Sequence, residues 1–154
     1  RRSLYIFRKR SMPDPMLSAF DAPNGDFACV RRIRSNTPLA ALTGLNETVM
    51  VEAAQAFAQR IWREGGTTDA TRAQHAYRLA TARAARPAER DAVVQLVADT
   101  RTRLSRGELK ANGIAFSALT RPTELPADAT PIDLAAWTVA ARVVLNLDET
   151  ITKN

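Results

Sequence analysis

The clearest pattern along the chain is a helical spacing of apolar side chains in its middle third. Apolar residues recur three or four positions apart between Val49 and Ile61, which is the spacing of one face of an α-helix. A capping residue precedes this series, and two consecutive glycines, Gly65 and Gly66, follow it. The pattern therefore predicts a helix over residues 46–64.

Three further helices are predicted from similar start and stop signals. Thr37 stands directly before Pro38, and a hydroxyl at the cap followed by proline at the first helical position favours a helix start. A second helix is expected after Thr68. A third is expected to begin at Pro87 and to be amphipathic, with apolar side chains on one face and charged side chains on the other. The predicted ranges are 38–45, 69–83 and 87–104.

The C-terminal third holds the most apolar helical pattern. Residues 132–147 are apolar around most of the helix circumference, including Trp137, which predicts a helix at the centre of the core. The preceding stretch has two prolines, Gly113 and little periodicity, which is typical of a long connection over the surface. The expected layout is helices over 37–106, a long loop over 107–130 and a buried C-terminal helix over 131–148.

The first 36 residues are expected to form an irregular segment. Three prolines and one Asn-Gly turn dipeptide interrupt it. Asp14 before Pro15 predicts a single capped helical turn. The apolar runs 4–7 and 27–30 lack a clean alternation, so they either pair as a short β-ribbon or remain loops.

Composition supports a helical protein. The chain has 154 residues, of which 45% are hydrophobic and 25% charged, as in an ordinary globular domain. Aromatic residues make up only 6%, and alanine supplies much of the apolar content, which favours closely packed helices. We expect a mainly α fold, a small bundle of about five helices, that forms a single domain or a C-terminal subdomain over residues 1–154. The sequence contains no apolar run near the roughly 20 residues that a membrane span requires.

Positive charge is concentrated at the N-terminal end. The net charge is +6, and the first 34 residues contain eight Arg and Lys against three Asp. Such a cluster attracts nucleic acid, acidic polysaccharide, small anions or an acidic partner domain, and it is also compatible with an ordinary solvated basic face. The sequence starts at Arg1 with neither methionine nor a leader peptide, so we expect a part of a longer polypeptide.

The chain carries no recognisable catalytic motif. It lacks the glycine-rich phosphate loops, the dinucleotide-binding fingerprint and the serine elbow of hydrolases. One histidine and one cysteine leave no zinc ligand set and no haem-attachment motif, so we expect no metal site and no cofactor held by this chain. His75 is expected on the solvent face of a helix and Cys29 as a small buried side chain.

An arginine-rich stretch before the first predicted long helix is the most suggestive constellation. Three arginines within residues 31–34 precede a helix N-terminus whose free N–H groups also attract anions, so together they can clamp a sulfate, phosphate or carboxylate. Alternatively, these arginines pair with nearby carboxylates and fix the loops. Aromatic residues do not alternate with the basic ones, which disfavours nucleic acid as a partner. The candidate anion- or substrate-binding residues are Lys9, Arg10, Asp21, Arg32, Arg34 and Asn36.

Six short motifs, in order along the chain, carry a resemblance to a known family. They are Arg2-Ser3-Leu4-Tyr5, Lys9-Arg10, Phe20-Asp21-Ala22-Pro23, Arg34-Ser35-Asn36-Thr37-Pro38-Leu39, Leu45-Asn46 and Leu145-Asn146-Leu147-Asp148-Glu149. Over nearly its whole length the chain resembles the C-terminal part of domain-of-unknown-function family 1553. It departs from the family pattern at Asn46-Glu47-Thr48, where Asn-Asp-Pro is usual, and it lacks a glycine expected within residues 82–85.

The resemblance implies a context and no activity. Members of this family are parts of large exported proteins of planctomycetes and related bacteria, so the resemblance implies an extracytoplasmic or secreted location. It also implies an upstream domain of unknown function and, often, a cytochrome-c-like or carbohydrate-binding-like module. Any haem would then belong to another part of the parent protein.

Three hypotheses for function follow from these observations. The favoured one is a helical module that packs on an upstream domain of the same polypeptide and contributes its arginine-rich segment to the interface or to a shared anion-binding cleft. A second is part of an enzyme acting on acidic or sulfated polysaccharide, in which Arg32, Arg34 and Asn36 position the substrate and Asp21 acts as acid or base. A third is a basic module that binds nucleic acid irrespective of sequence.

Overall fold

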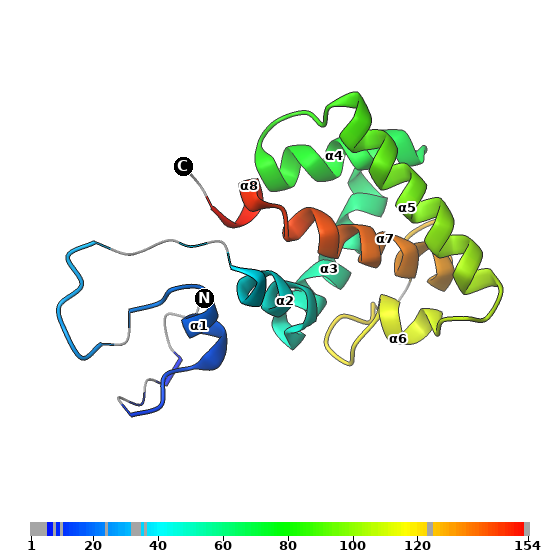
Figure 1. Cartoon of the computed structure of the whole chain (residues 1–154). Helices are drawn as coiled ribbons and strands as arrows, with labels where there is room; N and C mark the ends of the chain where they lie inside the picture. The colour runs from blue at the N-terminus through cyan, green and yellow to red at the C-terminus, as the bar shows by residue number, and fades with distance from the viewer. Residues whose placement is uncertain are drawn as a thin grey trace.

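The computed structural model of the chain is built from helices (Figure 1). It describes residues 6–152 apart from residues 8, 10, 24, 32–34, 36, 123 and 124. Five helices of nine or more residues within this described part confirm the predicted mainly α bundle of about five helices. None of the described helices is both long and apolar enough to cross a membrane. The helices are α1 (Pro15–Ala19), α2 (Pro38–Asn46), α3 (Thr48–Glu64), α4 (Asp69–Thr81), α5 (Pro87–Ser105), α6 (Ala111–Ala115), α7 (Pro131–Leu145) and α8 (Asp148–Ile151).

Local capping sets where most of the long helices begin. The hydroxyls of Thr37, Thr68 and Thr130 each accept a hydrogen bond from the backbone N–H three residues later, at 3.1–3.2 Å. These bonds satisfy donors that a helix N-terminus otherwise leaves free. Proline at the first or second position supports the starts of α2, α5 and α7. The predicted starts are therefore confirmed to within one or two residues.

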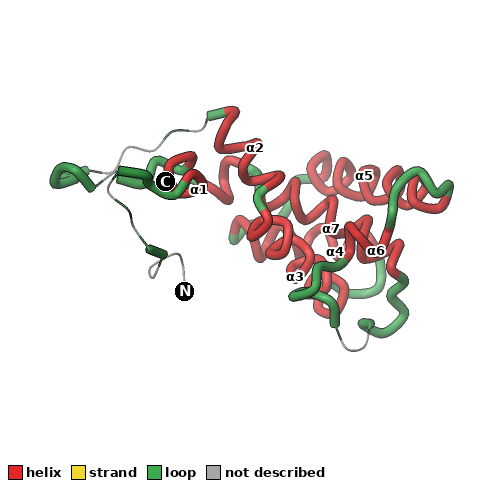
Figure 2. Tube along the Cα trace, turned by 90° about the horizontal axis from the view of Figure 1, so that it is seen from below, coloured by secondary structure: helices red, strands yellow, loops and turns green. Residues whose placement is uncertain are grey.

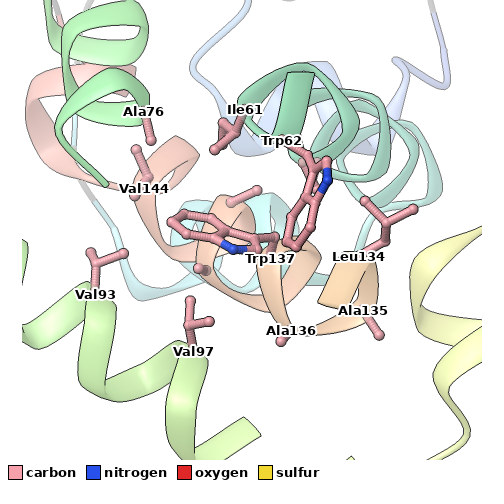
Figure 3. Close-up of a cluster of buried hydrophobic side chains, with 14 of the residues drawn as sticks. Ile61, Trp62, Ala76, Val93, Val97, Leu134, Ala135, Ala136, Trp137 and Val144 are labelled. Atoms are coloured by element: carbon pink, nitrogen blue, oxygen red, sulfur yellow. The ribbon is translucent and has the colours of Figure 1, made fainter. Parts of the chain in front are cut away.

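The core is assembled around α7, as Figure 3 shows. Trp137 and Leu134 are fully buried, and Trp137 lies between side chains of α3 and α5. Ile61 of α3 and Val97 of α5 pack against them with no exposed surface. Alanines line the same helices, and their small side chains let the helix axes approach closely. The predicted central position of the last long helix is confirmed.

The connection between α5 and α7 is more ordered than its sequence predicts. Residues 111–115 form the short helix α6, which packs on α7, whereas the sequence predicts a plain surface loop. Three side chains of α3 also hold this connection through its backbone carbonyls: Gln55 donates to Ile114, Gln59 to Thr120 and Trp62 to Ala127, at 2.7–3.0 Å. Contacts with α3 and α7, which are distant in sequence, therefore stabilise this segment.

Two side chains at the C-terminal end of α7, Arg142 and the capping residue Asn146, bind the C-terminal half of α2. The Asn146 amide, just after α7, donates to the Ala41 carbonyl at 3.2 Å, and the Arg142 guanidinium donates to the Leu45 carbonyl. The Leu45 carbonyl is one of the last four of α2, which lack a donor within the helix, and the bond to Ala41 adds a second contact one turn earlier. Gly44 permits the contact, since a Cβ there would lie 2.4 Å from Asn146 Oδ1. This anchor fixes α2 on the helical bundle.

The N-terminal segment, residues 6–37, lies beside α2 and away from the core (Figures 1 and 2). Asp14 caps α1 as predicted, by accepting from the Leu17 N–H at 2.9 Å. Among the described residues the possible β-ribbon does not form, and only an isolated bridge joins Lys9 and Met12. Cys29 is exposed, so its predicted burial is wrong. Its loop projects from the bundle, and the neighbouring side chains of Phe27 and Val30 are themselves exposed.

We expect Ala82→Gly to stabilise the protein by about 0.5–1 kcal/mol. Ala82 ends α4 in the left-handed conformation, with φ 61°, in the stretch where the family resemblance leads us to expect a glycine. A Cβ disfavours this conformation, and the exposed alanine side chain gives little packing in return. Chemical denaturation followed by circular dichroism measures the change. Ala84→Gly, at an exposed position without a positive φ, is the control and should destabilise; equal effects of the two substitutions would contradict the argument.

Candidate functional site

The structure describes two of the six predicted anion-binding residues. Lys9 is exposed, and Asp21 lies just after α1. Arg10, Arg32, Arg34 and Asn36 lie outside the described residues, so whether they converge with Asp21 stays a prediction.

Asp21 closes a loop that contains residues 25–31. It follows α1 in the left-handed conformation, with φ 56°, which aspartate tolerates better than most residues. The Ala22 N–H reaches back to the Leu17 carbonyl at 2.9 Å, as in a helix-ending Schellman turn. The Asp21 carboxylate accepts hydrogen bonds from both the backbone N–H and the hydroxyl of Ser35, each at 2.6 Å. The two ends of the loop are thereby joined at its base.

This loop and its surroundings present apolar side chains to solvent. Phe27 is 84% exposed and Val30 is 100% exposed, and both lie within the loop. Of the twelve large hydrophobic side chains that are exposed in the described part of the chain, eight precede residue 50. Five of the eight lie in the N-terminal segment, and the other three lie on α2 and at the start of α3. Exposed hydrophobic side chains in such numbers are typical of a binding surface. We call this set the N-terminal apolar surface: Ile6, Phe7, Met12, Phe27, Val30, Leu39, Leu42 and Val49.

No metal centre is evident in the described residues, which contain no group of three or more His, Cys, Asp or Glu side chains placed to hold an ion. The predicted absence of a cofactor in this chain stays a prediction.

A comparison with protein-family models assigns residues 1–97 to the family described as "Protein of unknown function (DUF1553)". The chain belongs to this family. The matched DUF1553 range contains the N-terminal apolar surface and the Asp21–Ser35 closure, and it ends within α5. The motif that begins at Leu145 lies beyond the match. Comparisons with curated proteins and with solved structures found no match.

Among the described residues of this DUF1553 chain, one ion-pair network joins three helices of the bundle. Arg101 of α5 donates through two nitrogens to both carboxylate oxygens of Asp69, at the start of α4, and through Nε to Asp133 of α7 at 2.9 Å. Burial alone raises the pKa of Asp69, but the hydrogen bonds and the charge of Arg101 outweigh burial and hold this pKa below its ordinary value. The network fixes the first turns of α4 and α7 against α5.

Arg72 and Arg83 have structural roles that sequence patterns did not indicate. The Arg72 guanidinium lies over the ring of Trp62, 3.6 Å from its centroid, which is a cation–π contact. Arg83 binds Glu89 through two nitrogens, at 2.7 and 2.8 Å, and also contacts Glu149 of α8. Hydrogen bonds from Arg83 and from the Arg86 backbone lower the pKa of Glu89 to about 2. Only the spacing of Arg83 and Glu89 around the α4–α5 turn could have suggested one of these contacts.

Proposed function

We propose that the chain is a helical docking module that binds an upstream domain of the same polypeptide through its N-terminal apolar surface. The observation that carries this proposal is that eight of the twelve exposed large hydrophobic side chains in the described residues precede residue 50, five of them in the segment beside the bundle. Val30 and Phe27 contribute little to the bundle core, because they are 100% and 84% exposed. Burying such a side chain in a partner is worth about 1.5–3 kcal/mol.

The positive charge of the same segment indicates the charge of the surface that it binds. Eight basic residues against three acidic ones in the first 34 residues favour an acidic partner surface with apolar pockets between its carboxylates. The family resemblance implies an upstream domain in an exported bacterial protein, which would supply that partner. The same proposal includes a small anion bound at the interface, with Lys9, Arg10, Arg32 and Arg34 as its ligands.

The described contacts of Asp21 favour docking over the polysaccharide enzyme. Its carboxylate accepts two hydrogen bonds from Ser35 at 2.6 Å, and these bonds give Asp21 a role in shaping the loop. A general acid or base must reach the bond that it protonates or deprotonates, so this structural role competes with a catalytic one.

The test is isothermal titration of the 154-residue chain with the separately produced upstream part of the polypeptide. We expect saturable binding that the double substitution Phe27→Ser and Val30→Ser weakens at least about tenfold, because apolar anchors carry most of the binding energy at interfaces. Circular dichroism should show an unchanged fold, since neither side chain packs in the core.

Leu119→Ser is the matched control. Leu119 is 83% exposed but lies in the connection between α6 and α7, so its loss should leave the affinity unchanged. Absence of binding, or equal loss in the control, would contradict the proposal. Binding to random-sequence DNA that collapses between low and moderate salt would instead support the nucleic-acid hypothesis.

A further inference from the structure

A cleft of about 520 Å³ lies along the exposed face of α4. Glu64 and Gly65, at the end of α3, form one side, His75 and Arg78 of α4 line its length, and Arg90 reaches it from α5. Its volume falls within the usual range of small-molecule sites. The cleft is lined by residues of α3, α4 and α5 and their connections, so it is independent of the N-terminal apolar surface.

The two glycines that end α3 shape the cleft. A Cβ on Gly65 would lie 2.5 Å from the Ile61 carbonyl oxygen and 2.9 Å from the Arg72 Cα, so only glycine lets α3 and α4 approach this closely. Gly66 has φ 85°, a left-handed conformation that side chains disfavour. Backbone therefore forms this end of the cleft, and the space beside it stays free of side chains.

Most polar side chains in the cleft already have partners. The Gln74 amide bonds both the N–H and the carbonyl of Ala85, at 3.0 Å each. Thr71 belongs to the cap of α4. Glu64 pairs with Arg60 at 3.0 Å, and His75 Nε2 lies 3.5 Å from the same carboxylate but is buried without a hydrogen-bond partner. These residues shape the walls and leave the arginines as the groups that can bind a ligand.

Arg78 and Arg90 give the cleft two positive charges, and in the described part of the chain Arg90 is paired with Asp91 whereas the Arg78 guanidinium is not paired. Among the residues described, the Arg78 guanidinium makes no hydrogen bond or ion pair, whereas its backbone carbonyl accepts from the Ala82 N–H. Arg90 lies near the start of α5, where the helix dipole disfavours a cation, and two of its nitrogens contact the Asp91 carboxylate at 2.7 and 2.8 Å. A ligand would use its remaining N–H groups or displace Asp91. Guanidinium groups bind planar or tetrahedral oxyanions through two parallel hydrogen bonds, and a cleft strengthens their combined field.

We propose that this cleft is a binding site for a small molecule that carries an oxyanion group, with Arg78 and Arg90 as the two cationic ligands. The neighbouring Glu64–His75 pair then offers an acceptor and a ring nitrogen to hydroxyl groups on the same molecule. The site requires neither the N-terminal segment nor an upstream partner, so its failure and the failure of the docking proposal are distinguishable.

The test titrates the 154-residue chain with inorganic phosphate, sulfate and citrate, in separate experiments at constant ionic strength with chloride as the balancing ion. Arginine side-chain NMR signals report which guanidinium groups respond. We expect saturable shifts of the Nε signals of Arg78 and Arg90, and at least about tenfold weaker binding in the variants Arg78→Gln and Arg90→Gln. A response to citrate alone identifies a carboxylate ligand, and a response to phosphate or sulfate identifies a tetrahedral one.

Arg106→Gln is the charge-matched control, because Arg106 is exposed and lies just after the far end of α5. Arg78→Lys keeps the charge and loses the two-pronged geometry, so it should also bind more weakly. The proposal is overturned if all arginine signals shift together without saturation, or if the control weakens binding as much as Arg78→Gln does. Either result would mean that only the overall positive charge attracts the anion.

Discussion

Trp137→Ala is expected to lower the free energy of unfolding by about 3–5 kcal/mol, the largest effect of any substitution considered. Trp137 has no exposed surface and lies in the middle of α7, between α3 and α5 (Figure 3). Truncating it removes the apolar contacts of the indole and leaves a cavity that three helices border. Because the surrounding alanines are already small, they cannot refill that space. Urea denaturation followed by circular dichroism measures the loss.

Two comparisons isolate the cause of this effect. Trp137→Phe keeps an aromatic ring in the same place and should cost clearly less than the alanine substitution. Leu119→Ala removes a large side chain that is 83% exposed, so the stability should change by less than about 0.5 kcal/mol. If Trp137→Ala cost no more than Leu119→Ala, α7 would not be the centre of the core.

The central position of α7 could be predicted because its signal is contained within the helix itself. Residues 132–147 are apolar around most of the circumference, and a helix with no polar face can only be buried. Helix starts at Pro38, Pro87 and Pro131 were predictable for a similar reason, since capping acts over three or four residues.

Features that depend on distant residues could not be predicted. The helix α6 is stabilised by α3 and α7, and its own sequence contains Asn112 and Gly113, which disfavour a helix. Cys29 resembles a buried residue by type, yet its loop projects from the bundle. His75 was expected to face solvent, whereas it lies half-buried in the cleft beside α4 because Glu64, at the end of the preceding helix, approaches it.

The candidate sites also depend on contacts between residues that are distant in the sequence. The exposed apolar residues at the N-terminal end look like core residues in the sequence, and only their exposure in the structure indicates a binding surface. The cleft depends on Gly65 and Gly66, which the sequence identifies as a helix end without revealing what lies beside it. Spacing along one chain says little about which side chains of different helices face each other.

Arg101→Gln is expected to lower the free energy of unfolding by about 2–3 kcal/mol at neutral pH, between the values for exposed and fully buried ion pairs. Arg101 holds Asp69 and Asp133, and the three side chains are only 20–26% exposed. Glutamine cannot supply the charge, so two carboxylates would face each other without their shared cation. Arg103→Gln, on the same helix but in a pair that is 43–59% exposed, should cost less than about 1 kcal/mol.

The pH dependence distinguishes loss of the ion pair from loss of packing. Arg101 holds the pKa of Asp69 below its ordinary value of 3.8, so the folded state binds this proton less readily than the unfolded state. The stability gained from the pair is therefore fully present above about pH 4 to 5 and is lost as the pH falls through the lowered pKa. The difference between wild type and Arg101→Gln should shrink in that acidic range. A difference that stays constant down to pH 2 would instead mean that Arg101 stabilises the bundle mainly by packing its side chain between α4 and α7.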